Sequence, residues 1–234
     1  MSDSVGTVDI AANVARIRER IAAATERCGR GPRPVRLVAV SKQMEPERIQ
    51  AAIAAGVADI GENYVQEAAA KRTEVGNGAQ WHLIGHLQRN KAAQAVQIFD
   101  MIQTVDSPRI AEAIGRRAQE QGRTLDVLIQ VNTSGEESKH GVSPQEVEGL
   151  LEAADGVAGI RVTGLMTIGR WDADPERARP EFRLLFDLAQ KLDGRAGARM
   201  EWLSMGMSHD FEVAIEEGAN LVRIGTGVFG PRAR

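Results

Sequence analysis

Residues 35–42 have the sequence Val35-Arg36-Leu37-Val38-Ala39-Val40-Ser41-Lys42. The run is almost wholly apolar up to Ser41, which predicts a β-strand buried on both faces. Lys42 then stands at the mouth of this strand, where it can lie in a partly dry pocket. Desolvation lowers the pKa of a lysine because it disfavours the ammonium form, and the neutral amine can condense with an aldehyde to form a Schiff base. Taken alone, the segment also fits a solvated lysine just past a strand end, which is the commoner case.

The composition predicts a soluble globular protein of one large domain or two small ones. The chain has 234 residues, of which 43% are hydrophobic and 26% are charged, so it can bury a sizeable core. The net charge of −3 gives no indication of a nucleic-acid partner or of an acidic membrane surface.

The cytoplasm is the expected location. Cys28 is the single cysteine and cannot form an internal disulfide, which fits a reducing compartment. No run reaches the roughly 18 apolar residues that a membrane span needs. The first residues, Met1-Ser2-Asp3-Ser4-Val5-Gly6, lack the basic and apolar regions of a secretory signal.

An amphipathic helix is predicted near the N-terminus. Ile10, Val14, Ile17 and Ile21 recur at spacings of four, three and four residues, which places them on one helix face. The glycines and prolines between Gly29 and Pro34 are expected to end this helix.

Beyond residue 34 the sequence alternates between strand and helix patterns. Helices are predicted at 46–55, 107–121 and 143–154, among others, with Pro46, Pro108 and Pro144 in their first turns and with Ser107 and Ser143 as N-caps. Strands are predicted at 35–41, 58–61, 81–84, 99–104, 125–131, 160–166, 200–203 and 220–224.

Eight strand–helix units in about 200 residues predict an α/β fold, a small (β/α)8 TIM-type barrel with an extra N-terminal helix. We expect a single domain over residues 1–234, with the helix and a linker in 1–34 and the barrel in 35–230. An open doubly wound sheet is the alternative, although no G-x-G-x-x-G motif follows the first strand.

Polar and glycine-rich motifs follow seven of the eight predicted strands. In a parallel barrel the carboxyl ends of all strands meet at one rim, where active sites lie. This convergence predicts a functional site at the rim. The motifs are Lys42, Gly61-Glu62-Asn63-Tyr64, Gly85-His86-Leu87-Gln88, Asn132-Thr133-Ser134-Gly135, Met166-Thr167-Ile168-Gly169, Ser204-Met205-Gly206-Met207-Ser208 and Gly225-Thr226-Gly227.

The loops after the seventh and eighth strands predict an anion site, because these two loops are the recurrent phosphate location in such barrels. Ser208 can cap a helix that begins near His209 and leave backbone N–H groups free. Gly225 and Gly227 let a phosphate approach the backbone, although the same glycines also suit plain tight turns. Arg223 shares the inward parity of Gly225, and a buried arginine needs a partner that a ligand could supply.

No metal site is predicted. His82 and His86 are four residues apart on a strand and turn rather than on a helix, and no cysteine or carboxylate cluster accompanies them in the sequence. His86 is expected to pack or to hydrogen-bond on the rim, and His140 is expected to be solvated within a charged loop.

The sequence resembles the pyridoxal-phosphate homeostasis protein family, small single-barrel relatives of the N-terminal domain of alanine racemase. The resemblance spans residues 35–230 in the family's order. It rests on Ala39-Val40-Ser41-Lys42, Gly61-Glu62-Asn63-Tyr64-Val65-Gln66-Glu67, Trp81-His82-Leu83-Ile84-Gly85-His86-Leu87-Gln88, Asn90-Lys91, Val131-Asn132, Gly135-Glu136-Glu137-Ser138-Lys139-His140-Gly141, Gly164-Leu165-Met166-Thr167-Ile168, Leu203-Ser204-Met205-Gly206-Met207-Ser208-His209-Asp210-Phe211 and Val222-Arg223-Ile224-Gly225-Thr226.

This resemblance implies that pyridoxal 5′-phosphate is bound covalently on Lys42, as an internal aldimine. It also implies that Arg223 faces the pyridine nitrogen of the cofactor. An arginine there disfavours protonation of that nitrogen, because two adjacent cations repel each other. The ring is then a weaker electron sink, which suits storage better than broad carbanion chemistry.

The resemblance places further residues at the cofactor. His209 departs from the family pattern, which commonly has a small or acidic residue after Met-Ser, so its role is not implied. The implied residues are Ser208, Gly225 and Thr226 on the phosphate, Ser204, Gly206 and Met207 along that loop, and Asn63 and His86 near the ring face.

The implied function is to hold, buffer and deliver pyridoxal phosphate, and so to contribute to vitamin B6 and amino-acid homeostasis without robust catalysis. Apo-forms of pyridoxal-phosphate enzymes are the expected partners, and a monomer is the expected state. An amino-acid racemase is the alternative, but it needs a base on each face of the substrate α-carbon. The single tyrosine, Tyr64, is expected to pack on the rim, and the chain ends at Arg234 with no room for the second domain of alanine racemase. A cofactor-free Schiff-base aldolase would also use Lys42 and would need a phosphorylated substrate.

Overall fold

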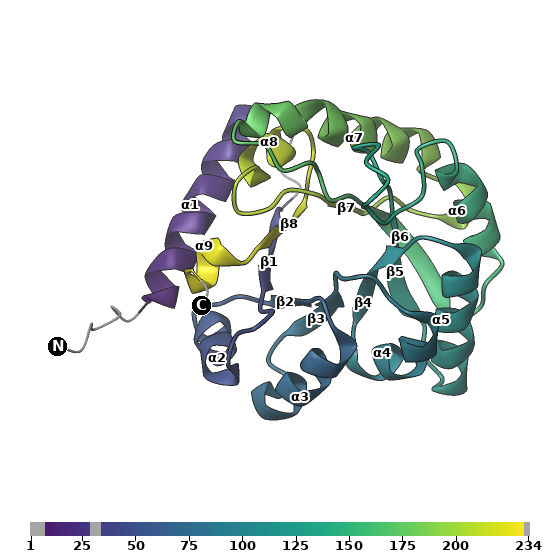
Figure 1. The fold of residues 1–234 in the computed structure, drawn as a ribbon, viewed down its shortest axis with the longest axis horizontal. Helices are drawn as coiled ribbons and strands as arrows, with labels where there is room; N and C mark the ends of the chain where they lie inside the picture. The colour runs from purple at the N-terminus through teal and green to yellow at the C-terminus, as the bar shows by residue number, and fades with distance from the viewer. Residues whose placement is uncertain (1–7, 29–33, 232–234) are drawn as a thin grey trace.

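The computed structural model describes residues 8–28 and 34–231, and the eight predicted strands close into one barrel (Figure 1). The strands follow one another around the barrel in chain order, and β8 returns to pair in parallel with β1. The fold is therefore the predicted (β/α)8 barrel. The open doubly wound alternative is wrong, because its sheet would have two free edges.

Each strand begins and ends within two residues of its predicted range. The strands are β1 (Arg36–Val40), β2 (Asp59–Glu62), β3 (Gln80–Leu83), β4 (Met101–Val105), β5 (Leu125–Gln130), β6 (Ile160–Met166), β7 (Trp202–Ser204) and β8 (Leu221–Ile224). The helices are α1 (Ile10–Cys28), α2 (Pro46–Ala54), α3 (Val65–Val75), α4 (Ala92–Ile98), α5 (Pro108–Glu120), α6 (Val147–Asp155), α7 (Arg179–Leu192), α8 (Phe211–Glu216) and α9 (Thr226–Phe229), with short 3-10 helices η1 (Arg89–Lys91), η2 (Pro175–Ala178) and η3 (Arg195–Gly197).

The extra N-terminal helix is confirmed as α1. Its predicted apolar face is buried, and the helix contacts α8, α9 and α2 on the side of the barrel where β8 meets β1 (Figure 1). The residues predicted to end it include Gly29, Gly31 and Pro32, which lie outside the described residues. Across residues 8–28 and 34–231, no helix combines the length and the apolar character that a membrane span requires.

The predicted helix at 143–154 begins later than expected. Val142 forms a bridge with Val131 beside β5, so the chain is still held against the barrel at that point. Ser143 and Pro144 then form a turn, in which the Ser143 N–H and Oγ–H donate to Glu146 Oε2 at 3.0 and 2.6 Å. The helix starts only at Val147, and Ser143 is not its N-cap.

The apolar core has two layers. The larger layer fills the space between the strands and the surrounding helices. A smaller cluster, with a residue from each of five strands, forms a separate apolar core: Val38, Met101, Leu128, Met166 and Leu221. Gln103 is two residues after Met101 in β4 and shares its inward parity, so polar side chains continue the barrel interior beyond this apolar cluster.

Gly164 tests how tightly the barrel is packed. A Cβ at this position would lie 1.9 Å from the carbonyl oxygen of Trp202 on the neighbouring strand, so Gly164→Ala forces the two strands apart. We expect a loss of about 2 kcal/mol or more in the free energy of unfolding, measured by urea denaturation. The control is Gly149→Ala in α6, where a Cβ meets nothing within 4 Å and the helix gains up to about 1 kcal/mol. Equal effects of the two substitutions would contradict the strand packing.

Candidate functional site

Closure of the barrel brings Lys42 beside residues almost two hundred positions later in the chain. The register of β1 on β8 pairs Val38 with Arg223 and Ala39 with Ile224. Val38 faces the barrel interior, and Lys42 stands in the turn that follows β1, one residue beyond Ser41. Gly225 lies against the end of β1, since a Cβ there would be 3.4 Å from the carbonyl oxygen of Val40. The rim therefore joins Lys42 to the loop that begins at Gly225.

The backbone on both sides of Lys42 is held by side chains. On one side, the carbonyl oxygen of Ser41 accepts a hydrogen bond from Lys71 Nζ at 2.6 Å. On the other side, the N–H of Gln43 donates to Glu67 Oε1. Gln43 has a φ of 61°, a left-handed conformation that is strained for a residue with a Cβ. The surrounding contacts hold the turn in this conformation, which fixes where the Lys42 side chain starts.

A buried ion-pair cluster anchors this turn. Lys71 Nζ lies 2.8 Å from Glu62 Oε1 and 2.6 Å from Glu67 Oε1, and only 7% of Lys71 is exposed. Burial raises the pKa of Glu62, and the hydrogen bonds from Lys71 and from Ser41 Oγ partly offset this effect. Glu62 Oε2 has no hydrogen-bond partner among the residues that the structure describes. The cluster is costly to bury, and it touches both neighbours of Lys42.

A chain of hydrogen bonds crosses the barrel interior from β8 to β2. Arg223 Nη1 donates to Ser204 Oγ at 2.5 Å, and Ser204 Oγ donates to Gln103 Oε1 at 2.6 Å. Gln103 Nε2 lies 2.9 Å from His82 Nδ1, and His82 Nε2 lies 2.9 Å from Asp59 Oδ1. All five residues are at most 4% exposed. The donors and acceptors agree along the whole chain when His82 carries its proton on Nε2.

The two ends of this chain carry opposite charges. At one end, burial favours the neutral form of Asp59, but the hydrogen bonds from His82 and Arg36 outweigh this effect and lower its pKa. At the other end, burial lowers the pKa of Arg223 to about 10. Arg223 Nη2 donates to the carbonyl oxygen of Thr167 at 2.7 Å. The Asp210 carboxylate attracts this cation and partly offsets the effect of burial, but within the described residues no carboxylate forms an ion pair with Arg223, so the guanidinium can still donate a hydrogen bond to a ligand atom.

The loops after β7 and β8 meet at their hydroxyl groups. Thr226 Oγ1 lies 3.3 Å from Ser208 Oγ, and the N–H of Gly227 lies 3.5 Å from the same oxygen. Gly206 has a φ of 90°, and a Cβ there would lie 2.8 Å from the Cα of Phe211. Small residues and hydroxyl groups from two loops therefore line one part of the rim, which is a suitable arrangement for a phosphate.

The predicted capping role of Ser208 is wrong. The helix begins at Phe211 rather than near His209, and Asp210 is its N-cap residue. The Asp210 carboxylate accepts the N–H of Met207 at 2.6 Å and so closes the turn before the helix. Ser208 is left facing the β8 loop, where its hydroxyl contacts Thr226 instead of the helix backbone.

Asn63 and His86 lie on the β2 and β3 side of the rim. Gly85 packs against the backbone of Asn63, since a Cβ at Gly85 would lie 2.2 Å from the Asn63 carbonyl oxygen. No carboxylate cluster was expected beside His86, and the structure places one carboxylate there, with His86 Nδ1 3.3 Å from Asp106 Oδ2. The ring of His86 also stacks on His140, with centroids 4.1 Å apart.

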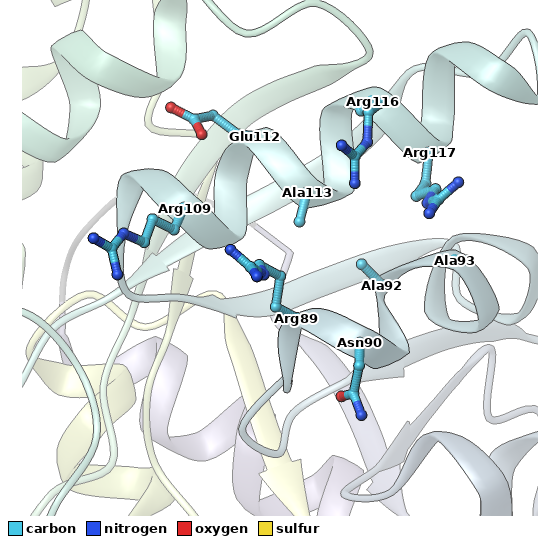
Figure 2. A pocket seen from close by; sticks show the side chains of 9 residues that line it. All are labelled: Arg89, Asn90, Ala92, Ala93, Arg109, Glu112, Ala113, Arg116 and Arg117. Atoms are coloured by element: carbon cyan, nitrogen blue, oxygen red, sulfur yellow. The ribbon is translucent and has the colours of Figure 1, made fainter.

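A large surface hollow lies between helices outside the barrel. It has a volume of about 710 Å³ and lies between η1 and α4 on one side and α5 on the other (Figure 2). Its side chains include Arg89, Arg109, Arg116 and Arg117. None of the residues predicted from the sequence to bind a cofactor lines it, so the hollow and the rim site are separate features of the molecule.

Comparison with known proteins places the chain in a family. Residues 12–233 match the family described as alanine racemase, N-terminal domain. The chain is 42% identical over 220 residues to the pyridoxal phosphate homeostasis protein of Aquifex aeolicus, which covers 94% of this chain and 96% of that protein. The chain belongs to the pyridoxal phosphate homeostasis protein family. The resemblance predicted from the sequence is therefore confirmed.

Solved structures agree with this membership. The structure of PipY of Synechococcus elongatus with pyridoxal phosphate bound is 36% identical, has a TM-score of 0.83, and covers 94% of this chain and 100% of that one. Alanine racemase of Clostridium difficile in complex with cycloserine is only 13% identical, with a TM-score of 0.69 over 92% of this chain and 60% of that one. The racemase shares the barrel fold with this family member, and the likeness extends no further.

The cluster behind Lys42 can be tested by removing its cation. Lys71→Met leaves the buried Glu62 carboxylate unpaired, so we expect the free energy of unfolding to fall by about 3–5 kcal/mol in urea denaturation. The control is Lys191→Met, which breaks an exposed pair with Glu148 and costs less than about 1 kcal/mol. A loss below about 1 kcal/mol for Lys71→Met would show that the cluster does not anchor the turn.

Asp59 predicts a specific dependence of stability on pH. Its pKa is lowered on folding, so its contribution is present above the unfolded-state value, near 3.8, and is lost as the pH falls through the lower folded-state value. Asp59→Asn should cost about 1–3 kcal/mol at pH 7. The difference from the wild type should stay constant down to about pH 4 and shrink below it. Urea denaturation from pH 7 to pH 3 measures this, and a difference that grows in acid would contradict the assignment.

Proposed function

We propose that this protein binds pyridoxal 5′-phosphate at the rim, as a Schiff base with Lys42 Nζ, and that it holds, buffers and delivers this cofactor. The observation that carries the proposal is the placement of Lys42 beside the β8 loop in a chain of this family. PipY, a relative of 36% identity, is described with pyridoxal phosphate bound. The protein would then contribute to vitamin B6 and amino-acid homeostasis in the cytoplasm.

The residues of the rim fit the two polar ends of this cofactor. The phosphate would contact Ser208, Gly225 and Thr226, whose hydroxyl and backbone groups meet between two loops. The loop after β7 would be lined by Ser204, Gly206 and Met207. The face of the pyridine ring would lie near Asn63 and His86.

Arg223 supports a storage role. Its guanidinium is buried among neutral acceptors, Ser204 Oγ and the Thr167 carbonyl oxygen, and would face the pyridine nitrogen. When bound, pyridoxal phosphate supplies an aldehyde that captures amines and a ring that acts as an electron sink. An arginine beside the ring nitrogen disfavours its protonation and weakens that sink.

The racemase alternative has less support from the structure. Tyr64 is 63% exposed and is the N-cap residue of α3, where it does not pack into the rim as a second base would. The racemase structures share the barrel at low identity only. We therefore propose a carrier without robust catalysis that acts as a monomer and passes the cofactor to apo-forms of pyridoxal-phosphate enzymes.

Lys42→Ala tests the attachment point. The wild-type protein, incubated with pyridoxal phosphate and reduced with borohydride, should carry one added cofactor mass on the peptide that contains Lys42. The Lys42→Ala variant should fold and keep a weak affinity for the cofactor through its phosphate group, but it should lose the reduced adduct. Lys91→Ala, which removes the lysine at the end of η1, is the control and should keep the adduct. Mass spectrometry of the digested wild type and of the two variants shows which peptide carries the adduct. An adduct on Lys91 or Lys139 would overturn the assignment.

The absence of robust catalysis has its own test. Chiral chromatography after long incubation of the loaded protein with L-alanine should show the L-form unchanged beyond the slow background of free pyridoxal phosphate. Rapid loss of optical purity, abolished in Lys42→Ala, would favour the racemase.

A further inference from the structure

Three potential metal ligands meet at the rim, on the strands farthest from β8. His86 follows β3, Asp106 follows β4, and His140 lies in the loop that follows β5. The nearest ligand atoms of the three side chains, two imidazole nitrogens and one carboxylate oxygen, all lie within 4.8 Å of one another. His86 Nδ1 and Asp106 Oδ2 are 3.3 Å apart. The imidazole rings stack with an interplanar angle of 10°, so one of these two exposed rings turns before both nitrogens point at one ion.

The backbone under the first two ligands is fixed by a direct contact. Thr104 Oγ1 donates to the carbonyl oxygen of Gly85 at 2.9 Å. Thr104 is two residues before Asp106, and Gly85 immediately precedes His86. This hydrogen bond joins the carboxyl ends of β3 and β4 next to the first two ligand residues, His86 and Asp106.

The third ligand is fixed by the base of its loop. Gln130 Nε2 donates to the His140 carbonyl oxygen at 3.2 Å, and the N–H of Asn132 donates to the Val142 carbonyl oxygen at 2.8 Å. Gly141 has a φ of 115°, and a Cβ there would lie 2.8 Å from the Asn132 nitrogen, so only glycine suits this close return of the chain. The loop therefore holds His140 over the end of β5 in spite of its exposure.

The ligand set and its spacing fit a small divalent transition metal. Two imidazoles and one carboxylate suit zinc and its neighbours rather than magnesium or calcium, which prefer oxygen ligands. Metal–ligand bonds of about 2.0–2.1 Å in a tetrahedron place ligand atoms about 3.3 Å apart. The His86–Asp106 separation already has this value. Three protein ligands leave a position open for water or for a group of a bound ligand.

We propose that His86, Asp106 and His140 form a binding site for a zinc-class divalent cation at the mouth of the barrel. The ligands come from the ends of β3, β4 and β5, and His86 would be shared with the proposed ring-face contact of pyridoxal phosphate, so the metal site is tested on protein free of that cofactor. A cation there would place a positive charge at the mouth through which an anionic ligand passes.

Metal titration of the full-length protein tests this site. The protein is first freed of adventitious metal with a chelator and then titrated with zinc chloride by calorimetry and with cobalt chloride by visible absorption. We expect one strong site per chain. Asp106→Asn and His140→Ala should each weaken zinc binding by at least about 10–100-fold, since even the loss of a residue that only hydrogen-bonds to a metal ligand has an effect of that size.

The control is His209→Ala, which removes an exposed histidine elsewhere whose Nε2 lies 3.1 Å from the Ala173 carbonyl oxygen. This variant should bind zinc as the wild type does. The far-ultraviolet circular dichroism of all variants should match, because none of the substituted side chains is buried. Zinc binding that is absent from the wild type, or that survives both Asp106→Asn and His140→Ala, would overturn the proposal.

Discussion

The pairing of β8 with β1 is the constraint on which the rest of the structure depends. It closes the barrel, removes both free edges of the sheet, and sets Ala39 opposite Ile224. Because the register is fixed, the residue after β1 and the residues after β8 meet at one rim although they are far apart in sequence. α1 packs over α8 and α9 on this side and covers the seam from outside. A one-residue slip in this pairing would turn Arg223 out of the interior, so register and site are specified together.

The polar side chains in the barrel interior serve to position groups for a ligand rather than to stabilise the fold. Within the described residues, Arg223 is buried without an ion-pair partner. The hydrogen-bond chain through Ser204, Gln103 and His82 pairs the polar groups next to it, and the guanidinium can still donate to a ligand. Partly satisfied buried charges destabilise a fold, and they persist where function needs them. The rim then has two halves. One joins Lys42 to hydroxyl groups and small residues, and the other holds the histidines and Asp106.

The sequence predicts the fold well and the site in part. Apolar strands and prolines in first helical turns are local features of the sequence, so the sequence predicts the eight strands, α1 and α2. The starts of α6 and α8 are not predicted, because Val142 is held by β5 and Asp210 closes its own turn. The sequence also does not predict which side chains contact His82 and His86. Gln103 lies on the neighbouring strand β4 and Asp106 directly follows that strand, and only the register shows that they meet these histidines. Gln103 does have a signal in the sequence, as a polar residue of inward parity in an apolar strand.

The central claim is that one rim holds the aldehyde end of the cofactor on Lys42 and its phosphate between the β7 and β8 loops. A crystal structure of the protein soaked with pyridoxal phosphate tests this most directly. The account predicts continuous density from Lys42 Nζ to the cofactor, with the phosphate at Ser208 and Thr226 and the ring nitrogen facing Arg223. Cofactor density in the arginine-lined hollow of Figure 2, with Lys42 directed to solvent, would contradict it.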